Sequence, residues 1–321
     1  MKSPRAFITG IAGFAGSWLA EELLAQGYQV AGSIYNHEPI DNIRHLENKL
    51  DLHELDIVDG EATTSLLTRL RPQYLFHLAA FASVGRSHQK VHVTLRVNLD
   101  GTLNMLEAAR QLKGLKQLLF VSSAEVYGIF TPKTKTLTEK QPVNPVSPYG
   151  ISKAAAEKLA LYYHRVYDLP VVIIRAFNHS GPRQTDDFVI PAFARQIAKI
   201  EAGRQKSVLK VGDLSAKRDF SDVRDIVRGY RLAAEKGTPG EIYQLCSGKA
   251  VTVQKVLDIL LAGAHKKVTV KPDPARMRKA DIPLLRGNNR KAAAQFGFTI
   301  RYKLKETLTD TLDYWRNKTQ V

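Results

Sequence analysis

The sequence predicts an α/β fold with a doubly wound parallel sheet, followed by a smaller mixed α/β C-terminal domain. Short runs rich in β-branched residues alternate with longer stretches of helical period, a pattern typical of parallel strands joined by crossover helices. Such connections are too long for hairpins, so helices are expected on both faces of the sheet. Strands are expected at residues 6–9, 28–34, 74–79, 118–122 and 171–175. Helices are expected at residues 14–26, 62–70, 97–111 and 148–167.

The rhythm of strands and helices changes after residue 176, where a second domain is expected to begin. Residues 1–176 form the first predicted domain, and residues 177–321 form most of the second. A segment near 222–236 is left open, because it can also pack back on the first domain. The expected elements of the second domain are a loop at 177–183, a helix at 191–202 and a strand with a turn at 208–220.

The composition is that of a folded globular protein. The chain has 321 residues, of which 44% are apolar and 24% charged, which excludes a disulfide-stapled miniprotein and a disordered chain. Its one cysteine, Cys246, lies in an apolar run and is predicted to be a buried core residue without a chemical role. No stretch reaches the roughly eighteen apolar residues of a membrane span, and no secretion signal is present. We therefore expect a cytoplasmic protein without membrane contact.

The charge balance suggests an anionic partner. Lys and Arg number 47 against 31 Asp and Glu, a formal net charge of +16, and residues 261–321 hold 14 basic and 5 acidic residues. A phosphate-bearing small molecule, a nucleic acid and a basic solvated surface without a partner are all compatible with this excess. The chain has no arginine-rich tract and no helix-turn-helix, zinc or RNP signature. We therefore predict no nucleic-acid partner, and no metal site.

A glycine-rich loop follows the first predicted strand. Gly10, Gly13 and Gly16 have the spacing G-x-x-G-x-x-G, and Phe14 and Ala15 begin the first predicted helix. Glycines allow a tight turn and a close approach to a pyrophosphate, which a helix N-terminus stabilises. A plain strand-to-helix turn is the alternative, but the position in the first βαβ unit is the one that a dinucleotide-binding Rossmann domain requires.

The second predicted strand bears on the choice of dinucleotide. No Asp or Glu stands at its end, where folds that bind NAD place an acid on the ribose, and Glu38 follows too late. The absence of that carboxylate favours NADP(H) over NAD(H), because nothing there would repel a 2′-phosphate. No Arg or Lys stands in the same turn to bind that phosphate, and the nearest cation is Arg44. Asp56 is expected either to reach the adenine or to cap the next helix.

A tyrosine and a lysine stand four residues apart in a predicted helix. Ser147 and Pro148 are expected to begin this helix, which places Tyr149 and Lys153 on one face. A nearby ammonium and an oxidised nicotinamide would lower the pKa of a phenol toward neutral pH. Ser123, at the end of the fourth strand, is expected at the same edge of the sheet.

These features together resemble the extended short-chain dehydrogenase/reductase family. The resemblance rests on the glycine loop, the Leu-Ala-Ala run at 78–80, Asn98, the serine-rich strand end and the Y-x-x-x-K pair. Segments 177–183, 210–214 and 218–225 are similar to enzymes of nucleotide-activated sugars, most of all the GDP-mannose 4,6-dehydratases and the GDP-4-keto-6-deoxy-D-mannose reductases. The chain departs from that branch at Lys279, which replaces a proline, and at residues 297–300.

The resemblance implies a role for each matching residue. Tyr149 would exchange the proton at the sugar 4-oxygen, Ser123 would hydrogen-bond that oxygen and Lys153 would hold the nicotinamide ribose. Glu125 joins these three among the predicted catalytic residues. The predicted cofactor-binding residues are Gly10, Gly13, Phe14, Ala15, Gly16, Asp56, Ile57, Leu78, Ala79, Ala80, Asn98, Tyr149 and Lys153. The predicted substrate-binding residues are Ser83, Asn178, Lys210, Arg218 and Arg278. The family also implies a homodimer through the helices at 97–111 and 148–167.

The residues after Ser123 bear on which reaction is catalysed. A dehydratase needs an acid for the leaving 6-hydroxyl, and Ala124 has no proton to give, although Glu125 remains as a base. An epimerase suits the Ser-Ser-Ala run, but the ribose-binding acid of tightly held NAD is missing. We therefore predict NADPH-dependent reduction of the C4 ketone of a GDP-4-keto-6-deoxyhexose, in deoxysugar biosynthesis. The alternatives are a GDP-mannose 4,6-dehydratase, a nucleotide-sugar 4-epimerase and a cofactor-binding regulator without turnover.

Overall fold

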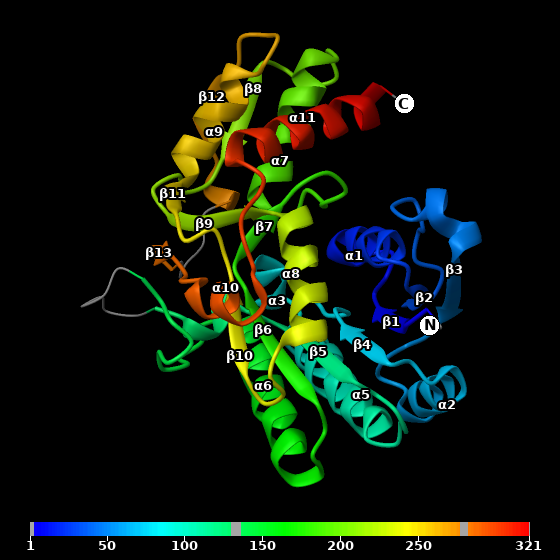
Figure 1. The fold of residues 1–321 in the computed structure, drawn as a ribbon. Helices are drawn as coiled ribbons and strands as arrows, with labels where there is room; N and C mark the ends of the chain where they lie inside the picture. Colours follow the sequence, from blue (N-terminus) through cyan, green and yellow to red (C-terminus); the bar gives the residue numbers. More distant parts are fainter. Residues whose placement is uncertain (1–2, 130–135, 277–281, 321) are drawn as a thin grey trace.

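The fold is built on a central parallel sheet (Figure 1). The computed structural model describes residues 3–129, 136–276 and 282–320. The strands of the sheet are β1 Arg5–Thr9, β2 Gln29–Ile34, β3 Leu50–Glu54, β4 Tyr74–His77, β5 Gln117–Ser123, β6 Val171–Ala176 and β10 Ile242–Leu245. They lie side by side in the order β10, β6, β5, β4, β1, β2, β3, and every neighbouring pair is parallel.

The strand order confirms the doubly wound α/β fold. From β1 the chain winds outward through β2 and β3, then crosses to β4 and continues in the opposite direction. Ligands of such sheets bind beyond the carboxyl ends of the strands where the winding reverses, here between β1 and β4. At this point a Cβ added to Gly10 would lie 3.2 Å from the Cα of Ala79, so the loops after β1 and β4 are in close contact.

Helices cover both faces of this sheet. Leu19, Val227 and Phe296 belong to the core on one face, and Leu67 and Met105 belong to the core on the other. The helices of the first face are α1 Phe14–Ala25, α8 Val223–Lys236 and α10 Arg290–Phe296, and those of the second are α2 Gly60–Leu70, α5 Gly101–Ala109 and α6 Pro148–Tyr167. Short helices are η1 Arg44–Lys49, α3 Val84–Ser87, α4 Val91–Leu95, η2 Arg96–Asp100, η3 Ala124–Tyr127 and η4 Pro274–Arg276.

A second core forms among elements after residue 176. Phe193, Leu257 and Leu312 are buried together there. Strand β9 pairs with β7, β11 and β13, and β8 pairs with β12. The helices around this core are α7 Val189–Glu201, α9 Val253–Ala262 and α11 Leu304–Gln320. The strands are β7 Asn178–Ser180, β8 Val208–Val211, β9 Lys217–Asp222, β11 Ala250–Thr252, β12 Thr269–Pro272 and β13 Leu284–Leu285.

The chain after residue 176 also contributes to the first sheet. Helix α8 packs against α1, and β10 pairs with β6, with Ile242 opposite Ile173. The division of the chain near residue 176 stays a prediction.

Three local predictions differ from the structure. The segment 177–183 was expected to be a loop, but Asn178 to Ser180 pair with β9 as a short strand. No strand was expected at residues 50–54, where the structure has β3 at an edge of the sheet. The helix expected at 97–111 is α5 preceded by a π-helical turn, η2, that holds Asn98. Each difference depends on a pairing or packing partner far away in the sequence.

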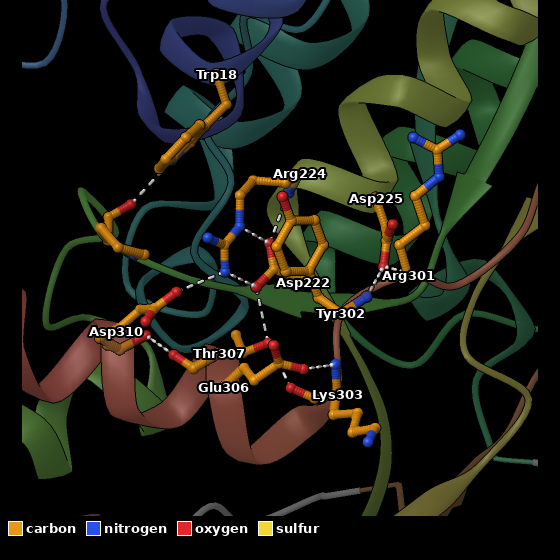
Figure 2. Close-up of polar contacts among 12 residues, drawn as sticks. Trp18, Asp222, Arg224, Asp225, Arg301, Tyr302, Lys303, Glu306, Thr307 and Asp310 are labelled. Carbon is orange, nitrogen blue, oxygen red and sulfur yellow. Dashed lines mark hydrogen bonds and ion pairs between the residues drawn. The ribbon is translucent and has the colours of Figure 1, made fainter.

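Helices α8 and α11 meet at a polar cluster around Arg224 (Figure 2). Nη2 of Arg224 lies 2.7 Å from a carboxylate oxygen of Asp222 and 2.7 Å from one of Asp310. Its guanidinium lies 3.8 Å from the ring centroid of Tyr302, and Asp222 also accepts a 2.8 Å hydrogen bond from Thr307 Oγ1. We call these five residues the Arg224 cluster.

Candidate active site

A large cavity lies where the carboxyl ends of the strands meet. Its volume is about 1140 Å³. Its walls come from the loops after β1, β2 and β4, the end of β5, the start of α6, and segment 176–188. The fold therefore brings most of the predicted site residues into one space. Those that line it are Gly10, Gly13, Phe14, Ala15, Gly16, Asp56, Ile57, Leu78, Ala79, Ala80, Ser83, Ser123, Glu125, Tyr149, Lys153, Asn178 and Arg218.

The glycine loop forms one end of this cavity. Gly10 has φ +69°, a conformation that favours glycine, and a Cβ on Gly16 would overlap the carbonyl oxygen of Gly10. Gly13 is the N-cap of α1 and offers no side-chain cap, while Phe14, Ala15 and Gly16 line the cavity. The first turn of α1 is therefore open to an anionic ligand, which fits the pyrophosphate of a dinucleotide.

The loop after β2 extends the cavity beyond the glycine loop. Asn36 and Glu38 line it, as does Asp56. Glu38 was expected to follow β2 too late to hold the cofactor ribose; the structure places it at the cavity, and its contact with a ribose is untested. Asn36 and His37 both have positive φ, so the chain turns back after β2 and brings Glu38 to the cavity. Asp56 accepts a 3.0 Å hydrogen bond from the backbone N–H of Val58, which orients its carboxylate.

Tyr149 faces Ser123 in the middle of the cavity. Ser147 caps α6 by accepting a 3.0 Å hydrogen bond from Gly150 N, which fixes the first turn that carries Tyr149. Burial raises the pKa of the Tyr149 phenol to about 12, the hydrogen bond with Ser123 lowers it, and the Glu125 carboxylate raises it. The pKa rises overall because the surrounding protein disfavours the phenolate more than Ser123 favours it. This direction applies to the protein without a dinucleotide, so the expected lowering of the phenol pKa by Lys153 and an oxidised nicotinamide stays a prediction.

Lys153 lies one turn further along α6 and is almost fully buried. Its Nζ donates a 2.8 Å hydrogen bond to the carbonyl oxygen of Val121 and lies 5.1 Å from the ring centroid of Phe120. Burial lowers the pKa of its ammonium to about 8, while the Glu157 carboxylate raises it. Lys153 is therefore mostly charged at neutral pH and is fixed toward the end of β5.

Glu157 forms a buried ion pair beneath the active-site helix. The Glu157 and Arg175 side chains are 3% and 4% exposed, and Arg175 Nη2 lies 2.7 Å from Glu157 Oε2. Glu157 Oε1 accepts a 2.5 Å hydrogen bond from Ser122 Oγ, next to Ser123. Arg175 also donates to Tyr127 Oη at 3.0 Å. This pair ties α6 to the ends of β5 and β6.

A chain of hydrogen bonds through His77 lies behind the cavity. Thr9 Oγ1 accepts the backbone N–H groups of Leu78 and Ala79, so its own proton is directed to Nδ1 of His77, 2.9 Å away. Thr102 Oγ1 donates to the Asn98 carbonyl, so Nε2 of His77 donates to Thr102 at 3.1 Å. Acceptance at Nδ1 requires a neutral imidazole, and burial, assisted by Lys153, lowers the His77 pKa to about 3.

Asn98 lies behind the cavity wall rather than in it. Its side chain is 1% exposed, accepts from Phe81 N at 2.7 Å and donates to Ser152 Oγ at 2.9 Å. Asn98 was predicted among the cofactor-binding residues, and the resemblance also implies that it helps to position the active-site helix; its place behind the wall agrees with the second role. The π-helical turn directs the amide toward α6, so Asn98 holds Ser152 on the helix of Tyr149 and Lys153.

The predicted substrate residues are only partly brought together. Ser83 and Asn178 line the cavity, as does Arg218, which is 7% exposed and donates to the carbonyl oxygen of Ile282. Lys210 is not at the cavity, because β8 presents it to solvent, where its Nζ lies 3.9 Å from Asp273. Arg278 lies outside the described residues.

Several cavity residues were missed by the sequence prediction. Among them are His179, Tyr230 on α8 and four residues of segment 184–188. His179 stacks on Phe14 with ring centroids 5.8 Å apart, which joins the segment after β6 to the glycine loop. No local pattern distinguishes these residues, since the long-range pairing of β7 and the packing of α8 bring them to the cavity.

Comparison with known proteins identifies the family. A family model described as GDP-mannose 4,6 dehydratase matches residues 7–311. The chain belongs to this family. A GDP-6-deoxy-D-mannose reductase of Pseudomonas aeruginosa is 32% identical over 98% of this chain and 98% of its own length. A UDP-glucose 4-epimerase of Mycolicibacterium smegmatis is 33% identical over 98% of this chain and all of its own length.

Solved structures agree with this family and confirm the fold. The structure of RMD from Pseudomonas aeruginosa complexed with NADPH has a TM-score of 0.84 at 31% identity, covering 98% of this chain and 100% of that chain. A UDP-glucose 4-epimerase of Thermus thermophilus in complex with NAD has a TM-score of 0.87 at 30% identity, covering 97% and 99%. The predicted NAD(P)-dependent nucleotide-sugar enzyme of the extended short-chain dehydrogenase/reductase family is thereby confirmed.

The described ranges lack two features, a membrane-spanning helix and a cluster of metal ligands. Among residues 3–129, 136–276 and 282–320, no helix is long and apolar enough to cross a membrane. The same ranges contain no group of three His, Cys, Asp or Glu side chains placed to hold a metal ion. Cys246 is buried, as predicted, in a cluster with Phe177 and Leu285.

Proposed function

We propose that this protein reduces the C4 ketone of a GDP-4-keto-6-deoxyhexose with NADPH. The observation that carries the proposal is the arrangement of Tyr149 beside Ser123 and Glu125, with Ala124 in the wall of the same cavity. Reduction of a ketone needs a proton donor at the carbonyl oxygen, whereas oxidation of a hydroxyl needs a proton acceptor there. A phenol with its pKa near 12 is present as the donor at neutral pH. The similarity to the Pseudomonas aeruginosa reductase also supports this direction of reaction.

The residues of this chain divide the work of the reaction. Bound NADPH would supply the hydride. Tyr149 would donate its phenolic proton to the sugar 4-oxygen, and Ser123 would hydrogen-bond that oxygen and hold it near the phenol. Lys153 would hold the nicotinamide ribose, and its positive charge would stabilise the phenolate that remains. The open first turn of α1 would bind the pyrophosphate, and Arg218 would bind the diphosphate of the substrate.

The residues of the same cavity wall are less suited to the elimination of water, the reaction of a 4,6-dehydratase. A 4,6-dehydratase must protonate a leaving 6-hydroxyl, and Ala124 carries no ionisable group. Glu125 lines the cavity and could act as a base. The dehydratase is therefore the second candidate, and Glu125 is the residue that separates the two.

The preference for NADPH is part of the proposal. It is supported by the end of β2, where Tyr35 and Asn36 occupy the places next to the strand, and by the NADPH complex of the Pseudomonas aeruginosa structure. The carboxylate of Glu38 in the cavity acts against it, because it would repel a 2′-phosphate. Calorimetric titration with NADPH and with NADH measures the preference. Tighter binding of NADH would overturn this part of the proposal.

A homodimer is proposed through α5 and α6. Exposed apolar side chains lie along these helices, at Leu103, Ile151, Tyr162, Val166 and Tyr167. A second copy of the chain would cover this face by two-fold symmetry. Light scattering of the purified protein tests it, and a monomer at micromolar concentration would contradict it.

The proposed activity is tested directly with GDP-4-keto-6-deoxymannose and NADPH. We expect NADPH oxidation at one equivalent per GDP-6-deoxyhexose, with the product identified by NMR. Tyr149→Phe removes the proton donor and should lower kcat at least about 100-fold. The control Glu125→Gln should stay within about threefold of the parent. A dehydratase would instead convert GDP-mannose without net use of NADPH and would be inactivated by Glu125→Gln.

A further inference from the structure

A second phenol at the cavity is not used by the proposed chemistry. Tyr230, on α8, is 0% exposed and lines the cavity. Its hydroxyl has no hydrogen-bond partner among the described residues. The aromatic ring packs in the core beneath the sheet, but that packing does not involve the hydroxyl. A phenylalanine would fill the same space, so the oxygen needs its own explanation.

The unpartnered hydroxyl has an energetic consequence. A buried donor without an acceptor loses its hydrogen bond to water, and no residue in the described part of the chain replaces that bond for Tyr230. Burial raises the pKa of Tyr230, and the neighbouring Tyr149 phenol raises it further, so the group stays a neutral donor across the working pH range. A ligand atom that enters the cavity with a free acceptor would satisfy it.

The position of Tyr230 indicates which part of a ligand it meets. Val223, Val227 and Tyr230 share the face of α8 that packs on the α1 side of the sheet. Tyr149 enters from α6 on the opposite side, and both phenols line the same cavity. The two helices thus flank the ends of β5 and β6. The glycine loop, where the pyrophosphate would bind, lies beyond β4 at the end of β1.

We propose that the Tyr230 hydroxyl hydrogen-bonds the carboxamide of the bound nicotinamide. A dinucleotide with its pyrophosphate on α1 and its ribose at Lys153 would bring its nicotinamide to the part of the cavity that Tyr149 and Tyr230 line. The carboxamide oxygen is an acceptor, and its amide group can donate to the same hydroxyl. The bond would fix the rotation of the ring and thus the face presented to the substrate. The proposal rests on dinucleotide binding and not on the identity of the sugar substrate.

The test compares Tyr230→Phe with the parent protein in binding two ligands. NADPH carries the carboxamide, and 2′-phospho-ADP-ribose is the same molecule without the nicotinamide. By titration calorimetry we expect Tyr230→Phe to bind NADPH about 5- to 20-fold more weakly and 2′-phospho-ADP-ribose with unchanged affinity. Without ligand, the melting temperature of the variant should equal or exceed that of the parent, because the variant loses an unsatisfied hydroxyl.

A matched control is Tyr243→Phe. Tyr243 is also buried in the core of the first sheet, but its hydroxyl accepts a hydrogen bond from Thr238 N and is not at the cavity. It should not change the affinity for either ligand. Equal NADPH affinity of Tyr230→Phe and the parent would overturn the proposal. An equal loss for both ligands would also overturn it, since Tyr230 would then act on another part of the dinucleotide. These outcomes do not depend on turnover, so they are separate from the test of the reductase.

Discussion

Two ion-pair clusters stabilise different parts of this molecule, and they differ in what would follow if one charge were lost. Glu157 and Arg175 are both buried, with 3% and 4% of their side chains exposed. In the Arg224 cluster Asp222 is buried, but Arg224 is 23% exposed and Asp310 is 40% exposed. Water can reach the second cluster and replace a lost partner there. At the first cluster, water cannot replace a lost partner. Removing one charge should therefore lower the free energy of unfolding more there than at the second cluster, although the N–O distances are similar.

The two clusters also differ in what depends on them. Glu157 holds Ser122, next to Ser123, and raises the pKa of Lys153. The Arg224 cluster holds the start of α8 to α11, and its residues are not among those that line the cavity. The first cluster therefore connects stability to the site, whereas the second connects two helices.

Breaking the buried pair should have the largest effect. Arg175→Met leaves the Glu157 carboxylate buried without its cation, and we expect the free energy of unfolding to fall by about 3–5 kcal/mol. Urea denaturation measures the loss. The double variant Arg175→Met/Glu157→Leu removes both charges and should recover most of the stability. A single-variant loss below about 1 kcal/mol would show that water reaches Glu157 after all.

Because His77 is buried in its neutral form, the free energy of unfolding should depend on pH. The pKa of His77 is lowered from 6.5 in the unfolded chain to about 3 in the folded protein. Between these values the unfolded chain binds more protons, so the stability contribution is complete above pH 6.5 and is lost as the pH falls toward 3. His77 alone should remove about 2 kcal/mol between pH 6.5 and 5. Urea titrations should show a smaller loss for His77→Gln, and an equal loss in both proteins would refute this.

The smallest effect is expected at the exposed end of the Arg224 cluster. Asp310→Asn removes a half-exposed carboxylate and should lower the free energy of unfolding by about 0.2–1 kcal/mol, less at high salt. Asp222→Asn is the matched comparison within the cluster. Asp222 is fully buried and accepts from Arg224 and Thr307, so its loss should be clearly larger. Equal losses would mean that exposure does not distinguish the two carboxylates.

The dinucleotide end of the cavity was predictable because its signals are local. Gly10, Gly13 and Gly16 follow one strand and begin one helix, and Tyr149 and Lys153 share one helix face. Both patterns depend on residues close together in the sequence. Each lies where a predicted parallel strand ends or where the helix after it begins, and these points share one edge of the sheet. The same holds for Ser123 at the end of β5.

The remainder of the site depends on distant partners. Tyr230 reaches the cavity only because α8 returns to the first sheet, and Asn178 only because β7 pairs with β9. The place of Glu38 at the cavity could not be predicted, because two residues with positive φ reverse the chain and no glycine marks that turn. The rise of the Tyr149 pKa by burial could not be predicted, because burial is a property of the whole cavity, which helical spacing does not reveal.

The place of β10 at the edge of the first sheet has a consequence for biosynthesis. Strand β6 keeps a row of unpaired N–H and C=O groups along one side until β10 has been made, and such an edge can pair with another chain. Residues 177–241 separate the two strands, and a ribosome needs roughly 3–13 s to add them at about 5–20 residues per second. During that interval the nascent chain carries an open sheet edge. A fragment that ends at residue 176 keeps this edge permanently and should aggregate where the whole chain does not.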